Sequence, residues 1–340
     1  MSSLPVNSAA AFGTVAVPGT APPATNGAAP ASSQEIEIGL GPALDRHSPL
    51  YDSCHYVVSS PVKRFRARVV AGAAQYGPDA GAGAVERAAV AIELFHAATL
   101  AHDDVVDDGQ LRRGRATIGA HAGNFAASLA GGWLFARAIE LFADAGDEPV
   151  SQFARTAAVV CQGEMLEVRC LYDTERSRDG YLEVIQAKTA SLIAFASWVG
   201  AYLGGAGREE VARLERYGEA VGMAFQIADD ILDLVADAEL TGKTPGSDLR
   251  QGVYTLPTIY ALEEDSFLAE ALRAGPEKDE VPHLVERIRA CGAIDAALVE
   301  CDGWVEEAIA ALPDTEPAAH EHLAALAEGV RRRLSEMAAP

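Results

Sequence analysis

The chain has 340 residues and a formal net charge of −22 at pH 7. A surface that binds nucleic acid is basic, so this charge argues against nucleic acid as a partner. The five cysteines are scattered and form no CxxC pair, which argues against both a disulfide framework and a zinc site and is typical of a cytoplasmic protein.

Residues 1–33 are rich in Ala, Pro, Gly and Ser and carry no charged side chain. Such a segment buries too little apolar surface to offset the entropy lost on ordering, so we expect a disordered leader. It does not read as a secretory signal, because it has no basic start and no compact apolar run. Residues 34–340 are predicted to form one all-α domain.

The remaining chain has the apolar spacing of three and four that is typical of buried helices, and proline is absent from 79–148 and 150–244. An uncharged run at 189–207 is long enough to span a membrane, but its four glycines favour a buried core helix. The spacing predicts helices over 85–106, 129–145, 214–237, 260–273, 281–290, 302–311 and 317–336. We therefore expect a large helical bundle.

The first acidic motif closes the predicted helix 85–106. Asp103 and Asp107 lie one turn apart on one helix face, and Asp104 lies beside them. The helix dipole is negative at this end, so the cluster is unfavourable unless a cation neutralises it. Oxygen ligands suit Mg²⁺. The alternative is a solvated acidic helix end.

A second acidic motif repeats this spacing at Asp229, Asp230 and Asp233, with Gln226 one turn earlier, in a strongly apolar setting where carboxylates need partners. Two such helices facing each other would hold several Mg²⁺ ions and a diphosphate, with Arg112 and Lys188 balancing its charge. The chain has only four lysines, and three of them fall in the motifs described here.

These motifs give the chain a family resemblance. It resembles a trans-isoprenyl diphosphate synthase of the polyprenyl synthetase family, and its first acidic motif is most similar to those of medium- and long-chain synthases. The match covers 50–262 and rests on KRFR (63–66), HAATLAHDDVVDDGQLRRGRAT (96–117), LFARA (134–138), GE (163–164), KTA (188–190), FQIADDILD (225–233) and GKTPGSDLRQGVYTLP (242–257). The resemblance implies an all-α isoprenoid synthase fold around a central cavity.

The resemblance also implies roles for individual residues. Three Mg²⁺ ions would be held by Asp103, Asp107, Asp229 and Asp233. The allylic diphosphate would be bound by Arg112, Lys188, Thr189, Gln226 and Lys243, and isopentenyl diphosphate by Lys63, Arg66, His96 and Arg113. The catalytic set would be Asp103, Asp104, Asp107, Arg112, Lys188, Asp229 and Asp230. Tyr181 is expected to be a core residue.

The implied reaction is Mg²⁺-dependent condensation of isopentenyl diphosphate with an allylic prenyl diphosphate. The family is typically homodimeric, and contact with a membrane would serve product release. Ala98 and Thr99 are small, which favours a polyprenyl product, whereas Phe95, ~12 Å below the metal site, would cap a medium-length one. A geranylgeranyl product is the nearest alternative.

Two departures from the family pattern leave other functions open. The loop before Lys63 has Pro and Val at 61–62 where the family has two glycines, and Gly132 replaces an aspartate. Both bear on the isopentenyl site, so a terpene cyclase that ionises one substrate stays an alternative. A non-catalytic regulatory subunit is a further alternative, although it would not need two intact acidic motifs.

Overall fold

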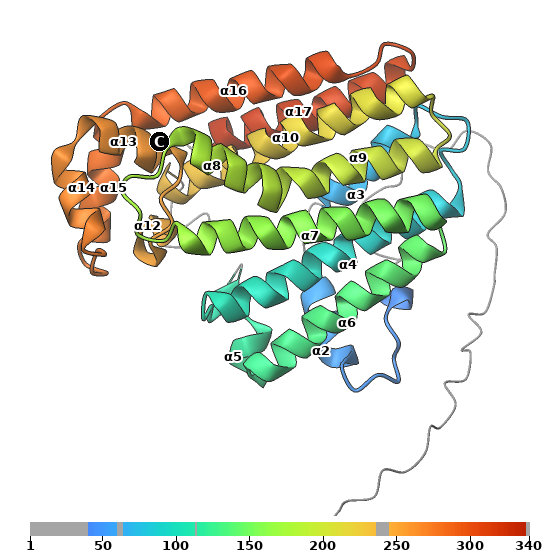
Figure 1. The fold of residues 1–340 in the computed structure, drawn as a ribbon, viewed down its shortest axis with the longest axis horizontal. Helices are drawn as coiled ribbons and strands as arrows, with labels where there is room; N and C mark the ends of the chain where they lie inside the picture. Colours follow the sequence, from blue (N-terminus) through green and yellow to red (C-terminus); the bar gives the residue numbers. More distant parts are fainter. Residues whose placement is uncertain (1–39, 60–63, 113, 236–244, 338–340) are drawn as a thin grey trace, which may run out of the picture.

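The structure is a computed structural model that describes residues 40–59, 64–112, 114–235 and 245–337 (Figure 1). The predicted leader, the loop at 61–62 and the candidate binding residues Lys63, Arg113 and Lys243 lie outside these residues.

The described residues form a helical bundle, which confirms the predicted all-α fold. The first half contains α2 (Tyr51–Val58), α3 (Phe65–Ala74), α4 (Gly83–Val106), α5 (Ile118–Ala122), α6 (Asn124–Ala143) and α7 (Asp147–Arg169). The second half contains α8 (Arg178–Ile185), a π-helical turn η1 (Gln186–Ala190), α9 (Ser191–Leu203), α10 (Arg208–Val235), α12 (Ser247–Gln251), α13 (Leu256–Glu264), α14 (Ser266–Arg273), α15 (Val281–Ala290), α16 (Ala293–Ala311) and α17 (Pro317–Met337).

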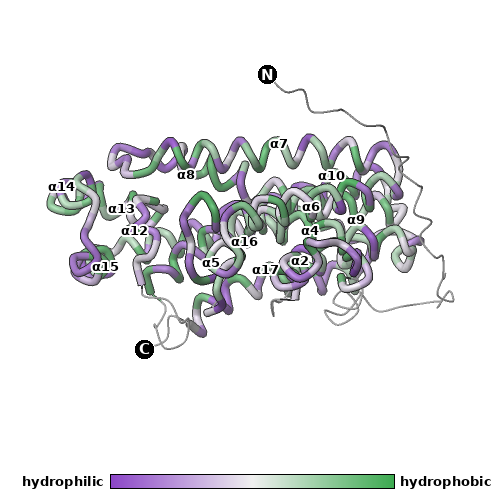
Figure 2. Tube along the Cα trace, turned by 90° about the horizontal axis from the view of Figure 1, so that it is seen from below, coloured by the Kyte–Doolittle hydropathy of each residue, from purple (hydrophilic) through white to green (hydrophobic). Residues whose placement is uncertain are grey.

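The long helices pack side by side around one large core. Helix α10 lies between α9 and α16, α4 lies against α6, and α3 packs on both α4 and α9 (Figure 1). Along α7, hydrophobic and hydrophilic residues alternate within the turns, as expected for a helix with one side on the core (Figure 2). Helices α12 to α15 form a smaller apolar cluster at one end of the bundle.

The predicted helices are found, but one is divided in two and several begin earlier than predicted. The segment 260–273 is two helices, because Asp265 has an extended backbone (φ −132°, ψ 98°) and its carboxylate accepts a hydrogen bond from the amide of Phe267 at the start of α14. The helix predicted at 302–311 begins nine residues earlier, at Ala293. A two-residue hairpin, β1 (Leu111–Arg112) and β2 (Arg115–Ala116), follows the first acidic motif.

Two helical segments of the described chain are long and apolar enough to cross a membrane by length and composition, α6 and the continuous run Arg178–Leu203. The most apolar window of Arg178–Leu203 is 67% buried inside the bundle, so the prediction of a core helix at 189–207 is confirmed. The window in α6 is only 33% buried. Helix α6 therefore presents an apolar face outward.

Candidate active site

The first acidic motif lies at the C-terminal end of α4, where its carboxylates point in different directions. Asp104 is 8% exposed and accepts a hydrogen bond of 2.7 Å from Nε of Arg112 in β1. Asp103 and Asp107 are influenced instead by Glu164 of α7 and Lys188 of η1. The motif thus has one internal ion pair and two carboxylates facing other helices.

The two carboxylates that face other helices are unfavourable as anions. Burial raises the pKa of Asp103 to about 7, and Glu164 adds to this effect, while Lys188 and Arg112 offset part of it. Burial also raises the pKa of Asp107, again with Glu164 and Lys188 acting in opposite directions. A further cation would favour the ionised form of both side chains.

Lys188 is held where three helical segments come into backbone contact. A Cβ atom on Gly163 of α7 would lie 2.5 Å from the backbone nitrogen of Lys188, and one on Gly222 of α10 would lie 2.6 Å from Cα of Ala190. The π-helical turn therefore fits between α7 and α10 only because both positions lack a side chain. Such turns are frequent at functional sites.

The ammonium group of Lys188 pairs with two acids one turn apart on α7. Nζ lies 2.8 Å from Oε2 of Glu164 and also contacts Glu167. Burial alone would lower the pKa of Lys188, but Glu167, Glu164 and Asp103 raise it above its usual range. Lys188 is therefore a fixed cation among carboxylates.

The two adjacent aspartates of the second motif have different surroundings. The side chain of Asp229 is 51% exposed and pairs with Nη2 of Arg333 at 2.8 Å. Asp230 is 5% exposed, and burial raises its pKa to about 7, although hydrogen bonds from Tyr181 and Gln226 act to lower it. Only Asp229 is open to a ligand.

Asp233, the third acid of the motif, accepts hydrogen bonds from Oγ of Ser247 at 2.5 Å and from the amide of Asp248 at 3.2 Å. Its role as a metal ligand stays a prediction. Burial raises the pKa of Asp248 well above its usual value, and Asp233, Asp230 and Asp229 raise it further. Asp248 is thus a fourth acid at this end of the site.

The candidate diphosphate ligands lie on the same helices. Thr189 of η1 donates a hydrogen bond of 2.8 Å to Oε1 of Gln226 on α10. Arg66 of α3 and His96 of α4 are half-buried. The ring of Phe65, next to Arg66, stacks on that of Phe225, next to Gln226, with 5.0 Å between centroids. The start of α3 therefore adjoins the second motif.

The two acidic motifs belong to one site. Glu167 raises the pKa of Asp107 in the first motif and of Asp230 in the second. Among the described residues, no three His, Cys, Asp or Glu side chains converge closely enough to hold a metal by themselves. Mg²⁺ usually takes one or two carboxylates and completes its shell with phosphate oxygens and water. The residues present therefore fit Mg²⁺ together with a diphosphate.

Aromatic side chains close the apolar region below the first motif. Ala98 is buried, and Phe95 packs edge-on against Phe153 of α7, with 5.0 Å between ring centroids. Phe153 also contacts the rings of Phe135, Phe142 and Phe195. This wall agrees with the expected capping position of Phe95, while the product length itself stays a prediction.

The sequence comparison decides the family. The family model described as polyprenyl synthetase matches residues 47–288, well over half of the chain. The chain belongs to the polyprenyl synthetase family. The resemblance drawn from the motifs is thereby confirmed, and with it the expectation of a prenyltransferase. Helices α16 and α17 lie beyond the matched region.

Individual relatives are similar over most of their length. The chain is 42% identical over 271 residues to nonaprenyl diphosphate synthase of Mycobacterium tuberculosis, covering 77% of this chain and 81% of that protein. It is 36% identical to octaprenyl diphosphate synthase of Escherichia coli, covering 77% and 83%. Its structure is similar to that of heptaprenyl diphosphate synthase from Staphylococcus aureus, with a TM-score of 0.83, 30% identity and coverage of 88% and 96%.

Several residues of the site were not identified from the sequence. Glu164 stands in a quoted motif, and Glu167 follows it at a spacing of three, so their shared helix face was a usable signal. Tyr181 is a core residue as expected, but its hydroxyl also donates a hydrogen bond of 2.6 Å to Asp230. Arg333 gave no local signal, because its contact with Asp229 spans 104 residues.

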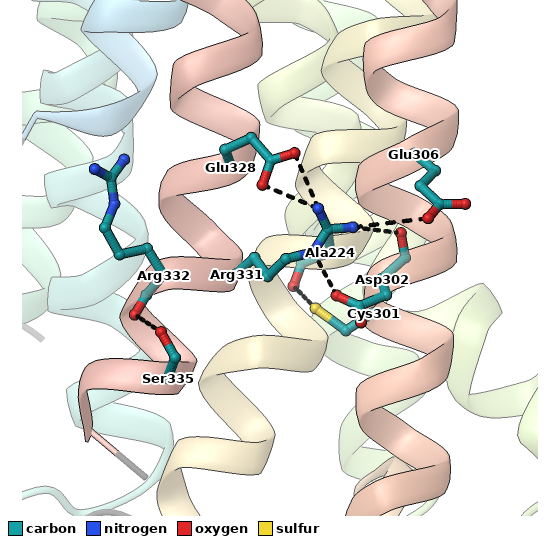
Figure 3. A network of polar contacts seen from close by, with 8 residues as sticks. All are labelled: Ala224, Cys301, Asp302, Glu306, Glu328, Arg331, Arg332 and Ser335. Atoms are coloured by element: carbon teal, nitrogen blue, oxygen red, sulfur yellow. Dashed lines mark hydrogen bonds and ion pairs between the residues drawn. The ribbon is translucent and has the colours of Figure 1, made fainter. Parts of the chain in front are cut away.

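Arg333 reaches the site because α17 is anchored to α16. Nε of Arg331 lies 2.6 Å from Oδ1 of Asp302, and its guanidinium also pairs with Glu328 and Glu306 (Figure 3). Arg333, two residues later, then extends to Asp229 of α10. In the absence of metal this arginine partly neutralises the open acid of the second motif.

The raised pKa values predict how stability depends on pH without metal. The folded Asp103 and Asp230 bind protons up to about pH 7, whereas an unfolded aspartate loses its proton near pH ~3.9. The folded chain therefore holds more protons over this window, and the stability that they provide is lost as the pH rises through 7. In EDTA, the thermal unfolding midpoint should be lower at pH 8 than at pH 5.

The control separates this effect from general repulsion in an acidic protein. Asp103→Asn should reduce the fall in midpoint between pH 5 and pH 8, whereas Asp144→Asn at the exposed end of α6 should leave it unchanged. Equal falls in the wild type and in the Asp103→Asn variant would show that the carboxylate does not have a raised pKa.

Proposed function

We propose that this enzyme catalyses the Mg²⁺-dependent condensation of isopentenyl diphosphate with an allylic prenyl diphosphate to give a longer all-trans polyprenyl diphosphate. The observation that carries the proposal is the pair of acidic motifs on one site, with raised carboxylate pKa values and Lys188 between them. Such a site favours metal ions that arrive with a diphosphate.

The residues divide into those that hold metal and those that hold the diphosphate. We assign Asp103, Asp107 and Asp229 to a group of three Mg²⁺ ions, with Asp233 as a further ligand. When bound, the metal supplies Lewis-acid stabilisation of the departing diphosphate. Lys188, Thr189 and Gln226 are placed to orient that group through an ammonium charge, a hydroxyl and an amide.

Arg112 adds a second fixed cation on the side of the first motif. Within the described chain only its Nε–H is hydrogen-bonded, to Asp104, so the ion pair fixes the direction of the guanidinium. Charge that develops on the leaving diphosphate is then met by groups that need no reorganisation. The apolar wall that includes Phe95 would exclude water from the allylic cation.

The product is proposed to be of polyprenyl length, as in the relatives named nonaprenyl and octaprenyl diphosphate synthase. The wall of Phe95 and Phe153 favours a medium-length member of this range. A geranylgeranyl product is the second candidate. A geranylgeranyl pyrophosphate synthase from Corynebacterium glutamicum is also structurally similar, with a TM-score of 0.76 and 35% identity.

A homodimer is supported by the outward face of α6 and α7. Phe125 is 80% exposed and Leu129 46% exposed, and Val159 of α7 is also exposed. Exposed apolar patches of this kind mark interaction sites. Contact with a membrane at product release stays a prediction. The five free cysteines support placement in the cytoplasm.

The reaction predicts a defined product ladder. Incubation with Mg²⁺, labelled isopentenyl diphosphate and farnesyl or geranylgeranyl diphosphate should give prenyl diphosphates that end at one length, read by mass spectrometry. Asp103→Asn should lower the rate by about 100-fold or more, since it removes a group that stabilises the transition state through metal. Asp108→Asn changes an exposed neighbour outside the assigned set and should retain activity.

The outcome that contradicts the proposal is specific. Diphosphate release without elongation would contradict condensation and favour the alternative of a terpene cyclase, in which the isopentenyl site has been lost.

The dimer is tested separately. Leu129→Glu places a charge on the apolar face of α6 and should shift the sedimentation velocity from dimer to monomer, because a buried charge without a partner is costly. Val299→Glu on α16, 73% exposed in the structure, is the matched control and should stay dimeric. A Leu129→Glu variant that sediments as the wild type would place the interface elsewhere.

A further inference from the structure

The two adjacent acids of the second motif have separate functions. One oxygen of Asp229 contacts Arg333 at a half-exposed position. Both oxygens of Asp230 are engaged inside the bundle: Oδ2 accepts from the hydroxyl of Tyr181 at 2.6 Å, and Oδ1 accepts from Nε2 of Gln226 at 2.8 Å. Asp230 therefore organises other side chains, whereas Asp229 is open to a ligand.

The hydrogen bonds of Asp230 determine how Gln226 is oriented. The amide nitrogen of Gln226 faces Asp230 and its oxygen faces Thr189, and an ionised Asp230 enforces this orientation because a carboxylate only accepts hydrogen bonds. That amide oxygen accepts a hydrogen bond of 2.8 Å from the hydroxyl of Thr189. An amide nitrogen carries two hydrogens, and only one is used on Asp230. The other is a donor for an anion, and its direction is fixed by Asp230.

Tyr181 is the first donor of this hydrogen-bond chain. Tyr181 lies on α8, which precedes the π-helical turn that carries Thr189. Its side chain is one of the largest fully buried side chains among the described residues. The guanidinium of Arg176 lies 5.4 Å from its ring centroid and donates to the carbonyl of Tyr254 at 3.1 Å. Burial and the contact with Arg176 thus hold the ring of Tyr181, which fixes its hydroxyl against Asp230.

We propose that the hydrogen-bond chain Tyr181–Asp230–Gln226–Thr189 positions the amide of Gln226 for the allylic diphosphate, with Tyr181 and Thr189 as positioning residues and Tyr181 away from the substrate. The inference rests on the proposed function, because that function assigns Gln226 to the allylic group. According to this inference, the hydrogen-bond chain affects binding at the allylic site and leaves binding at the isopentenyl site unchanged.

Removal of the tyrosine hydroxyl should act through Gln226. Without a donor at Oδ2, the buried Asp230 carboxylate can turn, and the Gln226 amide loses its fixed direction. A hydrogen bond to a charged group is among the stronger ones. We expect Tyr181→Phe to raise the KM for the allylic diphosphate about tenfold, which corresponds to about 1.4 kcal/mol, with the KM for isopentenyl diphosphate within about twofold of wild type.

The chain offers a matched control. Tyr217 of α10 is also fully buried, and its hydroxyl donates a hydrogen bond of 2.8 Å to the carbonyl of Leu323, outside the site. Tyr217→Phe removes the same group and should lower the unfolding midpoint without changing either KM. If Tyr181→Phe lowers stability and leaves the allylic KM unchanged, as this control does, the positioning role is wrong.

A binding measurement makes the test independent of turnover. Titration calorimetry with Mg²⁺ and farnesyl S-thiolodiphosphate, which is not cleaved, should show about tenfold weaker binding for Tyr181→Phe and unchanged binding for Tyr217→Phe. Thr189→Val should weaken binding by itself. The double variant Tyr181→Phe/Thr189→Val should lose less binding free energy than the sum of the losses in the two single variants. Full additivity would contradict a chain that acts as one unit.

The two proposals fail in distinguishable ways. A wild-type protein that binds the thiolodiphosphate but does not elongate would overturn the condensation activity, and the comparison of the two tyrosine variants would still decide the positioning role. A wild type that elongates, together with equal effects of Tyr181→Phe on both KM values, would overturn only the positioning role.

Discussion

The site depends on the position of Lys188, a cation held among carboxylates. Lys188 lies on a π-helical turn that fits between α7 and α10 because Gly163 and Gly222 have no side chains, and Glu164 and Glu167 then hold its ammonium group. This close packing sets α7 and the π-helical turn against α10, whose last turns carry the second motif. The position of Lys188 relative to that motif is thus set by backbone contact between helices, which is rigid.

One lysine does not balance the acids around it, and this imbalance links structure to function. Burial raises the pKa of Asp103, Asp230 and Asp248, so the site without metal holds charge at a free-energy cost. Arg112 and Arg333 each neutralise one acid, from opposite sides of the site. The remaining negative charge would favour the binding of divalent cations, and cations bound there would attract the diphosphate of the proposed substrate.

The sequence predicted what depends on local periodicity and missed what depends on tertiary contact. The spacing of Asp103 and Asp107 is a property of one helix, so their shared face was readable. The different surroundings of Asp229 and Asp230 could not be read from the sequence, because their partners Arg333 and Tyr181 come from the distant helices α17 and α8. The prediction of one helix over 260–273 was wrong at Asp265. There the side chain caps the start of α14, and this cap outweighs the apolar spacing.

The proposed function requires the two motifs to share metal ions that bind with a diphosphate. The most direct test is a crystal structure with Mn²⁺ and farnesyl S-thiolodiphosphate, with the metals located by anomalous scattering. We expect peaks beside Asp103 and Asp107 and beside Asp229, all bridged by diphosphate oxygens, with Arg333 displaced from Asp229. A diphosphate bound with metal at one motif only, and the ion pair between Arg333 and Asp229 intact, would contradict this requirement.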